Sequence, residues 1–208
     1  MAQPYPLLTL LGSLALSAQL SAATLNEDVV GDLSGNRLAP TPLTLDAGSN
    51  LVSGHYGRAI GGGVDLDYLH IILPAGHALV ALQVLPGTTH GGGRSFIGVQ
   101  AGTQLTVAPN AAQPSDLLGY GHFTAVSSPL DILADMGNRF GEGFGSQGFV
   151  APLRGTDYTF WIMETQANVA FDYRFNFEVS AVPLPASSVT LGAALASLML
   201  LRRRHGRS

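Results

Sequence analysis

Residues 171–181 alternate between apolar and polar side chains without interruption. The apolar positions hold Phe171, Tyr173, Phe175, Phe177, Val179 and Ala181. Successive side chains of a β-strand point to opposite faces of a sheet, so this pattern predicts a strand with one buried face and one face in water. It is the clearest indication that the body of the chain is built from β-strands.

Shorter β-rich runs occupy much of the sequence before this strand. They span residues 66–73, 78–85, 95–100, 105–108, 121–126 and 157–164, with weaker candidates at 43–45 and 50–53. Turns rich in Gly, Pro, Asn and Asp separate them, and only residues 129–136 suggest a short helix. The connector 74–77 contains Pro74 and Gly76, which predict a β-hairpin between the first two runs. The sequence therefore predicts an all-β fold, an antiparallel β-sandwich.

The first 23 residues are typical of a secretory signal peptide. An apolar run at 7–16 is too short to span a bilayer comfortably, and the small residues at 21–23 are of the kind that signal peptidase accepts. We predict cleavage between Ala23 and Thr24. Because residues 1–6 contain no Arg or Lys, a buried N-terminal helix is the alternative interpretation.

The C-terminus combines a Pro-x-Pro motif, an apolar segment and an arginine cluster. These parts are Val182, Pro183, Leu184 and Pro185, then residues 186–201, and finally Arg202, Arg203 and Arg204. The 16 uncharged residues of the middle part are near the lower limit for a transmembrane helix, and the arginines would hold the C-terminus on the cytoplasmic side. A plain C-terminal membrane anchor is one alternative. An amphipathic packing helix is another, but the segment has no polar face.

This tail resembles the PEP-CTERM sorting signal, which an exosortase recognises in Gram-negative bacteria that make extracellular polysaccharide. The resemblance covers residues 182–204 and departs from the family at Leu184, where glutamate is usual. It implies a transient stay in the inner membrane, cutting near the Pro-x-Pro motif, and release or attachment of the body at the cell surface. Signal peptidase and an exosortase-type sorting enzyme are the processing partners that it implies.

The segment between the two end signals is acidic. Residues 24–182 hold 6 arginines against all 14 acidic residues of the chain, a formal charge of −8, and the chain has no lysine. Such a surface repels nucleic-acid backbones, and without lysine the chain has neither a Walker-type phosphate loop nor a Schiff-base lysine. Because the chain has no cysteine, an exported body must be stabilised by its own core. We therefore predict a signal peptide at 1–23, one extracytoplasmic domain at 24–181 and a sorting signal at 182–208.

Within the body, residues 63–76 resemble a stretch of the bacterial pre-peptidase C-terminal domains, in which Asp-x-Asp-Tyr, a strand and Pro-Ala-Gly follow one another. These domains are compact β-sandwiches appended to secreted proteins. Residues 158–161 fit the penultimate strand of such domains more loosely. The resemblance implies a jelly-roll-like sandwich and a family that includes collagen-, polysaccharide- and calcium-binding modules, but it assigns no ligand residue in this chain.

Asp65 and Asp67 are the residues that we predict as metal ligands. They lie two residues apart at the start of a strand, so both carboxylates can point to one face and offer oxygen atoms to Ca²⁺. The alternative is that they bind turn amides or face water. Glu27, Asp28 and Asp32 form a second acidic group, which we expect to be solvated because it lies near the start of the mature chain.

We predict no catalytic residue and no enzymatic activity. The six histidines lack the HExxH or i, i+4 spacing of zinc sites, and we expect His70 to be a hydrogen-bonded histidine within a sheet. The chain has no GxSxG elbow, no SxxK motif and no cysteine for nucleophilic catalysis. Its carboxylates are the only feature that would suit a secreted glycoside hydrolase.

Five aromatic residues lie in or beside glycine-rich loops: Tyr56, Tyr120, Phe140, Phe144 and Phe149. Their rings either stack on sugars or plug the ends of the sandwich. We expect an exported, non-catalytic protein that leaves the inner membrane for the periplasm, the outer surface or the biofilm matrix of a Gram-negative bacterium, where exopolysaccharide is a candidate partner and nucleic acid is not. The alternative is a calcium- or carbohydrate-binding β-sandwich module, with Ca²⁺ as the one candidate cofactor.

Overall fold

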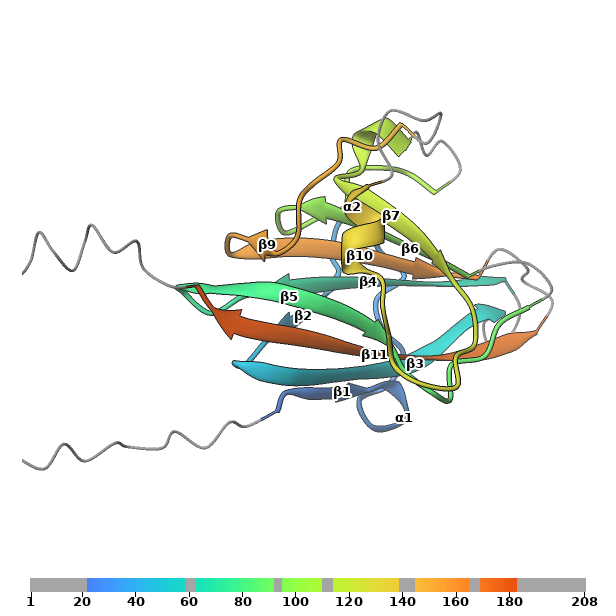
Figure 1. The fold of residues 1–208 in the computed structure, drawn as a ribbon. Helices are drawn as coiled ribbons and strands as arrows, with labels where there is room; N and C mark the ends of the chain where they lie inside the picture. Colours follow the sequence, from blue (N-terminus) through green and yellow to red (C-terminus); the bar gives the residue numbers. More distant parts are fainter. Residues whose placement is uncertain are drawn as a thin grey trace, which may run out of the picture.

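The computed structural model describes residues 22–58, 63–91, 95–109, 114–138, 145–164 and 169–182, and these residues form mainly antiparallel β-structure (Figure 1). The strands are β1 (Thr24–Asn26), β2 (Thr41–Thr44), β3 (Gly48–Arg58), β4 (Val64–Ile72), β5 (His77–Val84), β6 (Ser95–Ala101), β7 (Gly119–Phe123), β8 (Leu130–Asp131), β9 (Leu153–Arg154), β10 (Asp157–Met163) and β11 (Ala170–Ala181). The helices are short: α1 (Glu27–Val30), η1 (Pro114–Asp116) and α2 (Leu133–Gly137). The predicted all-β class is confirmed.

The strands form one curled sheet with the hydrogen-bonded order β7-β6-β10-β4-β3-β11-β5-β8. The short strands β1 and β2 pair in parallel with β3 and β4, and β9 pairs with β5. β3 and β4 are joined only where Gly57 pairs with Asp65 and Arg58 with Val64. Away from this bridge, β3 pairs with β1 and β11 whereas β4 pairs with β2 and β10, so the bridge links two groups of strands.

The strand β11 has the alternation that its sequence predicts. Its inward aromatic side chains, Tyr173, Phe175 and Phe177, are fully buried, and the neighbouring Asp172 and Arg174 are exposed. The Phe177 ring meets Phe160 of β10 edge to face, with 5.3 Å between the ring centroids. This contact joins the two groups of strands, because β10 pairs with β4 and β11 pairs with β3. The main core therefore fills the inside of the curl.

A smaller core lies on the opposite face of β4 and β10. Side chains alternate along a strand, so Tyr68 and Trp161 point away from the main core, which contains their neighbours Leu69 and Phe160. The two outward rings stack with centroids 6.2 Å apart. Other buried residues complete the cluster: Leu105, Val107, Leu117 and Tyr120.

The predicted hairpin between residues 66–73 and 78–85 is wrong. The two runs do form the consecutive strands β4 and β5, and Gly76 has the positive φ of +73° that the turn requires. However, β4 pairs with β2, β3 and β10, whereas β5 pairs with β8, β9 and β11. The connector carries the chain from one group of strands to the other, because a turn sequence specifies local geometry and not the partner strand.

Three further expectations change in detail. Residues 105–108 form no strand, and Leu105 and Val107 instead cover the smaller core. The predicted helix at 129–136 is divided between β8 and α2. β1, α1 and β9 were not predicted, because strands of two or three residues and a single helical turn are too short to show a hydrophobic period.

Candidate metal centre

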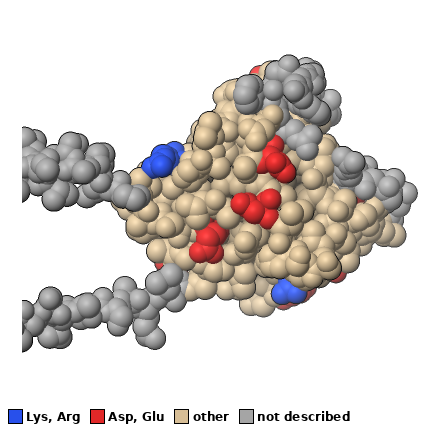
Figure 2. Space-filling model, in the orientation of Figure 1, with Lys and Arg blue, Asp and Glu red and all other residues tan. Residues whose placement is uncertain are grey.

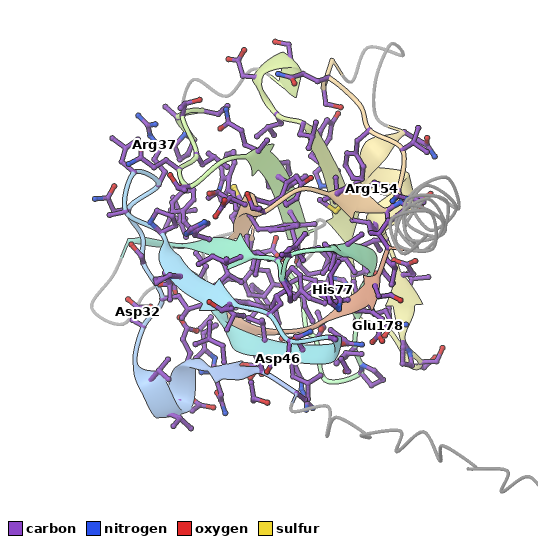
Figure 3. The ribbon with its side chains drawn as sticks, turned by 90° about the vertical axis from the view of Figure 1, so that its left-hand side faces the viewer. Asp32, Arg37, Asp46, His77, Arg154 and Glu178 are labelled. Atoms are coloured by element: carbon purple, nitrogen blue, oxygen red, sulfur yellow. The ribbon has the colours of Figure 1, made fainter. Side chains whose placement is uncertain are left out.

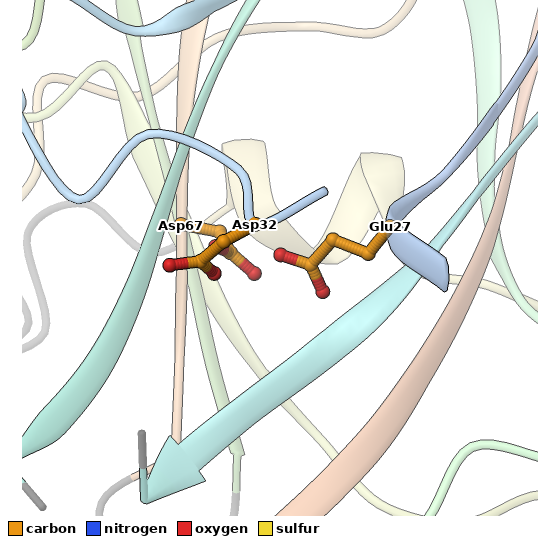
Figure 4. Close-up of side chains that lie close together, drawn as sticks. All are labelled: Glu27, Asp32 and Asp67. Atoms are coloured by element: carbon orange, nitrogen blue, oxygen red, sulfur yellow. The ribbon is translucent and has the colours of Figure 1, made fainter. Parts of the chain in front are cut away.

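Three carboxylates from separate chain segments meet near β3 and β4. Glu27, Asp32 and Asp67, which we call the acidic cluster, can each place one carboxylate oxygen so that all three oxygens lie within 4.8 Å of one another (Figure 4). Glu27 belongs to α1, Asp32 to the loop after it, and Asp67 to β4. Glu27 and Asp67 are buried, whereas Asp32 is exposed. One side of the cluster is therefore open to solvent.

Glu27 is held in place by backbone hydrogen bonds. The residue is 6% exposed, its Oε1 accepts a hydrogen bond from the Leu33 N–H at 2.8 Å, and its Oε2 accepts one from the His55 N–H. Burial raises the pKa of Glu27, while the two backbone hydrogen bonds lower it. Our expectation that Glu27 is solvated is wrong, because α1 turns this side chain into the fold while Asp28 stays outside.

Gly54 provides the space that the Glu27 carboxylate occupies. A Cβ atom at this position would overlap Oε2 of Glu27 and would lie 2.5 Å from the hydroxyl oxygen of Tyr173. Both contacts are closer than real Cβ atoms come to other atoms. A residue with a side chain at position 54 would therefore displace Glu27, Tyr173 or both.

Asp67 is the most unusual member of the acidic cluster. It is 0% exposed, and neither of its carboxylate oxygens has a hydrogen-bond partner among the described residues. Burial, and then the charge of Glu27, raise the pKa of Asp67 to about 9. The adjacent Tyr173 hydroxyl lowers it, although the two groups do not meet in hydrogen-bonding geometry. Asp67 is therefore neutral at pH 7 unless a cation compensates its charge.

Asp65 lies close to the cluster without belonging to it. Burial raises the pKa of Asp65, the charge of Asp32 raises it further, and His55 opposes the shift. Of the two residues predicted to bind Ca²⁺, only Asp67 belongs to the acidic cluster. The other two members of the cluster are Glu27 and Asp32. Sequence spacing identified one member of the cluster, and no local signal linked it to the N-terminal segment.

On the outer face of the sheet, His55 forms two ion pairs. Its Nε2 lies 3.0 Å from Asp28 Oδ1, and its Nδ1 lies 2.8 Å from Asp172 Oδ1. The hydrogen bond to Asp28 raises the pKa of His55, partial burial lowers it, and Asp172 raises it again. Asp28, His55 and Asp172 line a groove of about 390 Å³ together with Arg174. Through these two contacts, the His55 ring links Asp28 of the N-terminal segment to Asp172 of β11.

His70 fits the expectation of a hydrogen-bonded histidine in a sheet. Its Nε2 lies 2.8 Å from Asp157 Oδ1, and in the β4–β10 pairing His70 lies opposite Thr159, two residues after that aspartate. The hydrogen bonds from Thr156 and then from His70 lower the pKa of Asp157. This pair joins two neighbouring strands and does not contribute to the acidic cluster.

The loop aromatics that are described have structural roles. Tyr56 is 0% exposed and Tyr120 is 7% exposed, so neither ring presents a face to a sugar. Phe149 is partly buried and packs against the main core. Phe140 and Phe144 lie outside the described residues.

The processing sites lie at the margins of the described chain. Thr24 begins β1, and the carbonyl oxygen of Ala23 accepts a hydrogen bond from the Leu51 N–H at 2.9 Å. Val182 is described, whereas residues 1–21 and the rest of the sorting motif, Pro183, Leu184, Pro185, Arg202, Arg203 and Arg204, lie outside the described residues. Among the helices that the structure describes, none has the length and apolar character to cross a bilayer.

Neither a family model nor a curated protein matches this chain. The resemblances of the tail and of residues 63–76 therefore rest on the motifs alone.

The surface agrees with the charge count of the sequence. On the face drawn in Figure 2, acidic side chains lie near the centre and arginines only near the edges. Oxygen ligands and an acidic surface suit a hard cation such as Ca²⁺ or Mg²⁺ better than they suit an anion.

Proposed function

We propose that this chain is an exported, non-catalytic protein of the bacterial surface or extracellular matrix, whose body is a ligand-binding β-sandwich. Signal peptidase would cut between Ala23 and Thr24, and an exosortase-type enzyme would cut near Pro183 and Pro185. The exported body would then associate with the biofilm matrix or its exopolysaccharide. The basis for export is the pair of end signals in the sequence.

The positions of the two ends of the body support this proposal. β1 begins opposite Leu51, near the start of β3. β11 runs antiparallel to β3, so its last residues, beyond the pairing of Val179 with Gly48, also lie near the start of β3. Both ends of the described chain therefore leave the sheet on the same side (Figure 1). A body with this arrangement can be held at a membrane by either end, or by both, without disturbing the strands between them.

The acidic cluster lies away from that side. Glu27 contacts the backbone of His55, and Asp65, two residues from Asp67, pairs with Gly57 near the far end of β3. During transit through the membrane, the cluster would thus face away from the attached ends. This geometry suits a module that binds its ligand outside the cell.

The proposed sandwich is supported by the two groups of strands. β10 and β11 belong to different groups, yet Phe160 and Phe177 touch across the main core. Two sheets that bury their inner faces against one another are the defining feature of a β-sandwich. The bridge between β3 and β4 would be the corner at which the chain passes between the sheets.

The intact mass of the native protein, recovered from surface, medium and membrane fractions of its host, tests the proposal. We expect a mass that lacks the first 23 residues and everything after about Pro185, and excess mass would identify an attached glycan or lipid. A Pro183→Ala/Pro185→Ala variant should keep its tail, and a Leu184→Glu variant should be cut at least as completely as the wild type. A cytoplasmic protein would contradict export, and a full-length protein in the membrane fraction would identify a plain anchor.

The alternative function is a calcium- or carbohydrate-binding module. The burial of Tyr56 and Tyr120 removes two of the rings that were candidates for stacking on sugars. The acidic cluster instead offers several carboxylate oxygens at one point. Between the two ligands, the geometry favours the cation.

A further inference from the structure

We propose that Glu27, Asp32 and Asp67 form a binding site for one divalent cation, Ca²⁺, which joins the N-terminal segment to β4. The observation that carries this proposal is Asp67, a fully buried carboxylate without a hydrogen-bond partner among the described residues. A buried carboxylate without a partner is costly, and proteins usually avoid the cost by protonation, by an ion pair or by binding a metal.

No basic side chain is available to form that ion pair within the described part of the cluster. The ring nitrogens of His55 lie 3.0 Å and 2.8 Å from Asp28 and Asp172 on the outer face, so this base is already paired outside the cluster. The charges that act on Asp67 are all negative and come from Glu27, Asp65 and Asp32. The cluster therefore concentrates negative charge that a divalent cation would neutralise.

The Tyr173 hydroxyl is a second buried group without a described partner at the same place. Tyr173 is 0% exposed, and its hydroxyl has no hydrogen-bond partner among the residues that the structure describes. The missing side chain of Gly54 lets this hydroxyl and the Glu27 carboxylate approach the same point. The Asp67 carboxyl group of β4 and the Tyr173 hydroxyl of β11 thus lie beside a third group, the Glu27 carboxylate, which is already held by two backbone N–H groups.

The chemistry of the donors selects the kind of metal. All the donors are oxygen atoms, and neither histidine nor cysteine takes part, so the site suits a hard cation rather than zinc or copper. Three carboxylates can offer up to six oxygens, and Ca²⁺ accepts six to eight oxygen ligands in flexible geometry. Mg²⁺ requires a near-ideal octahedron and keeps several of its waters, which a mainly buried cluster accommodates less well. The exposed Asp32 leaves an entry path from solvent.

Calorimetric titration of the full chain, purified in mild detergent and stripped with a chelator, tests the site. With CaCl₂ we expect one saturable site per chain and a dissociation constant between about 10⁻⁷ and 10⁻³ M, the range that covers sensor and extracellular calcium modules. Affinity for MgCl₂ should be at least about tenfold weaker. A wild-type chain that is folded by circular dichroism and binds neither ion would overturn the proposal.

Two variants locate the site. Asp67→Asn replaces the carboxyl group with a neutral group of the same size, so the variant should fold, and we expect its Ca²⁺ affinity to fall by about tenfold or more. Asp46→Asn is the matched control, because Asp46 is exposed and lies apart from Asp32 (Figure 3). Its affinity should stay within about twofold of the wild type. Unchanged affinity in Asp67→Asn, or an equal loss in both variants, would show that calcium binds elsewhere.

Terbium luminescence provides a readout that does not depend on heat of binding. Tb³⁺ prefers the same oxygen ligands as Ca²⁺ and emits when a nearby excited aromatic ring transfers energy to it. Tyr173 lies beside Asp67, so Tb³⁺ should emit on excitation of the protein, and Ca²⁺ should displace it. Emission that persists in Asp67→Asn would contradict the assigned position. These results do not depend on export, so a failure of this site and a failure of the proposed function are separate outcomes.

Discussion

Asp67 and Tyr173 lie next to one another inside the curled sheet, and neither finds a hydrogen-bond partner among the described residues. Both are 0% exposed. Burial is the main reason that the pKa of Tyr173 lies well above its usual value and that the pKa of Asp67 rises to about 9. Without a bound cation, both groups are therefore neutral at pH 7, and the free energy of unfolding must depend on pH.

The first prediction follows from Asp67 in the calcium-free protein. Its pKa is about 9 in the folded state and near its ordinary value of 3.8 in the unfolded state. Between these values the folded state binds more protons, so stability is fully present below pH 3.8 and is lost as the pH rises through 9. The loss approaches about 1.4 kcal/mol per pH unit for one proton. Asp67→Asn should remove this contribution to the pH slope.

Urea denaturation between pH 5 and pH 9 in the presence of a chelator measures the slope. Asp46→Asn should keep the wild-type slope, because Asp46 is exposed. Added Ca²⁺ should restore stability to the wild type at high pH, because a ligand that binds only the folded state stabilises it. Parallel pH profiles for the wild type and Asp67→Asn would show that Asp67 is not the residue responsible.

The second prediction concerns the space at Gly54. Gly54→Ala would place a methyl group against the Glu27 carboxylate and 2.5 Å from the Tyr173 hydroxyl oxygen. Overpacking of this kind typically costs about 1–3 kcal/mol, which thermal and urea denaturation would detect. We also expect weaker Ca²⁺ binding, because Glu27 would be displaced.

Gly35→Ala is the matched control for this substitution. The nearest atom to a Cβ at position 35 is the Leu66 carbonyl oxygen at 3.6 Å, an ordinary contact. Its free energy of unfolding should therefore lie within about 0.5 kcal/mol of the wild type. Equal stability of the Gly54→Ala and Gly35→Ala variants would mean that the Glu27 pocket is looser than the structure indicates.

Much of the sheet could be predicted from the sequence because a strand with one buried face has a period of two. The alternation at 171–181 identified β11, and the apolar runs identified β4, β5, β6 and β10. Pairing was not predictable in the same way. Pro74 and Gly76 specify a tight turn, but the longest pairing of β4 is with β10, which is far away in the sequence.

The acidic cluster, like the strand pairing, could be predicted only in part from the sequence. The spacing of Asp65 and Asp67 correctly placed both on one strand, β4. Glu27 was expected to be solvated because it lies near the start of the mature chain, and its neighbours Asp28 and Asp32 are indeed exposed. Only the three-dimensional position of α1 beside Gly54 turns Glu27 inward, and no short-range pattern encodes that position.

The third prediction uses the His55 ion pairs. The pKa of His55 is raised, chiefly by Asp28, so the stability from these pairs is fully present below its ordinary pKa of 6.5 and is lost as the pH rises through the folded-state value. The His55 side chain is 45% exposed, so solvent screening limits the contribution to below about 1 kcal/mol. His55→Gln should therefore cost more at pH 5.5 than at pH 8.5.

Urea denaturation at the two pH values measures this difference. His77→Gln is the control, since the His77 ring forms no ion pair among the described residues and its Nδ1 lies 3.0 Å from the nearby Ala75 carbonyl oxygen. An NMR titration of the His55 ring should give a pKa above the ordinary histidine value of 6.5. If the cost of His55→Gln did not change with pH, the charged ring would not be the source of the stabilisation.

The fourth prediction concerns Asn50, which closes the turn before β3. Asn50 is 0% exposed; its Oδ1 accepts a hydrogen bond from the Asp46 N–H at 2.8 Å, and its Nδ2 lies 3.0 Å from the Phe177 carbonyl oxygen. Asn50→Leu would leave these backbone groups without their partner inside the fold, at an expected cost of about 2–4 kcal/mol. Ser49→Ala, which removes one partly buried hydrogen bond to Asn176, should cost only about 1 kcal/mol. Urea denaturation of both variants tests this order. A larger loss in Ser49→Ala would mean that the side-chain contact with β11, rather than the buried turn, stabilises the start of β3.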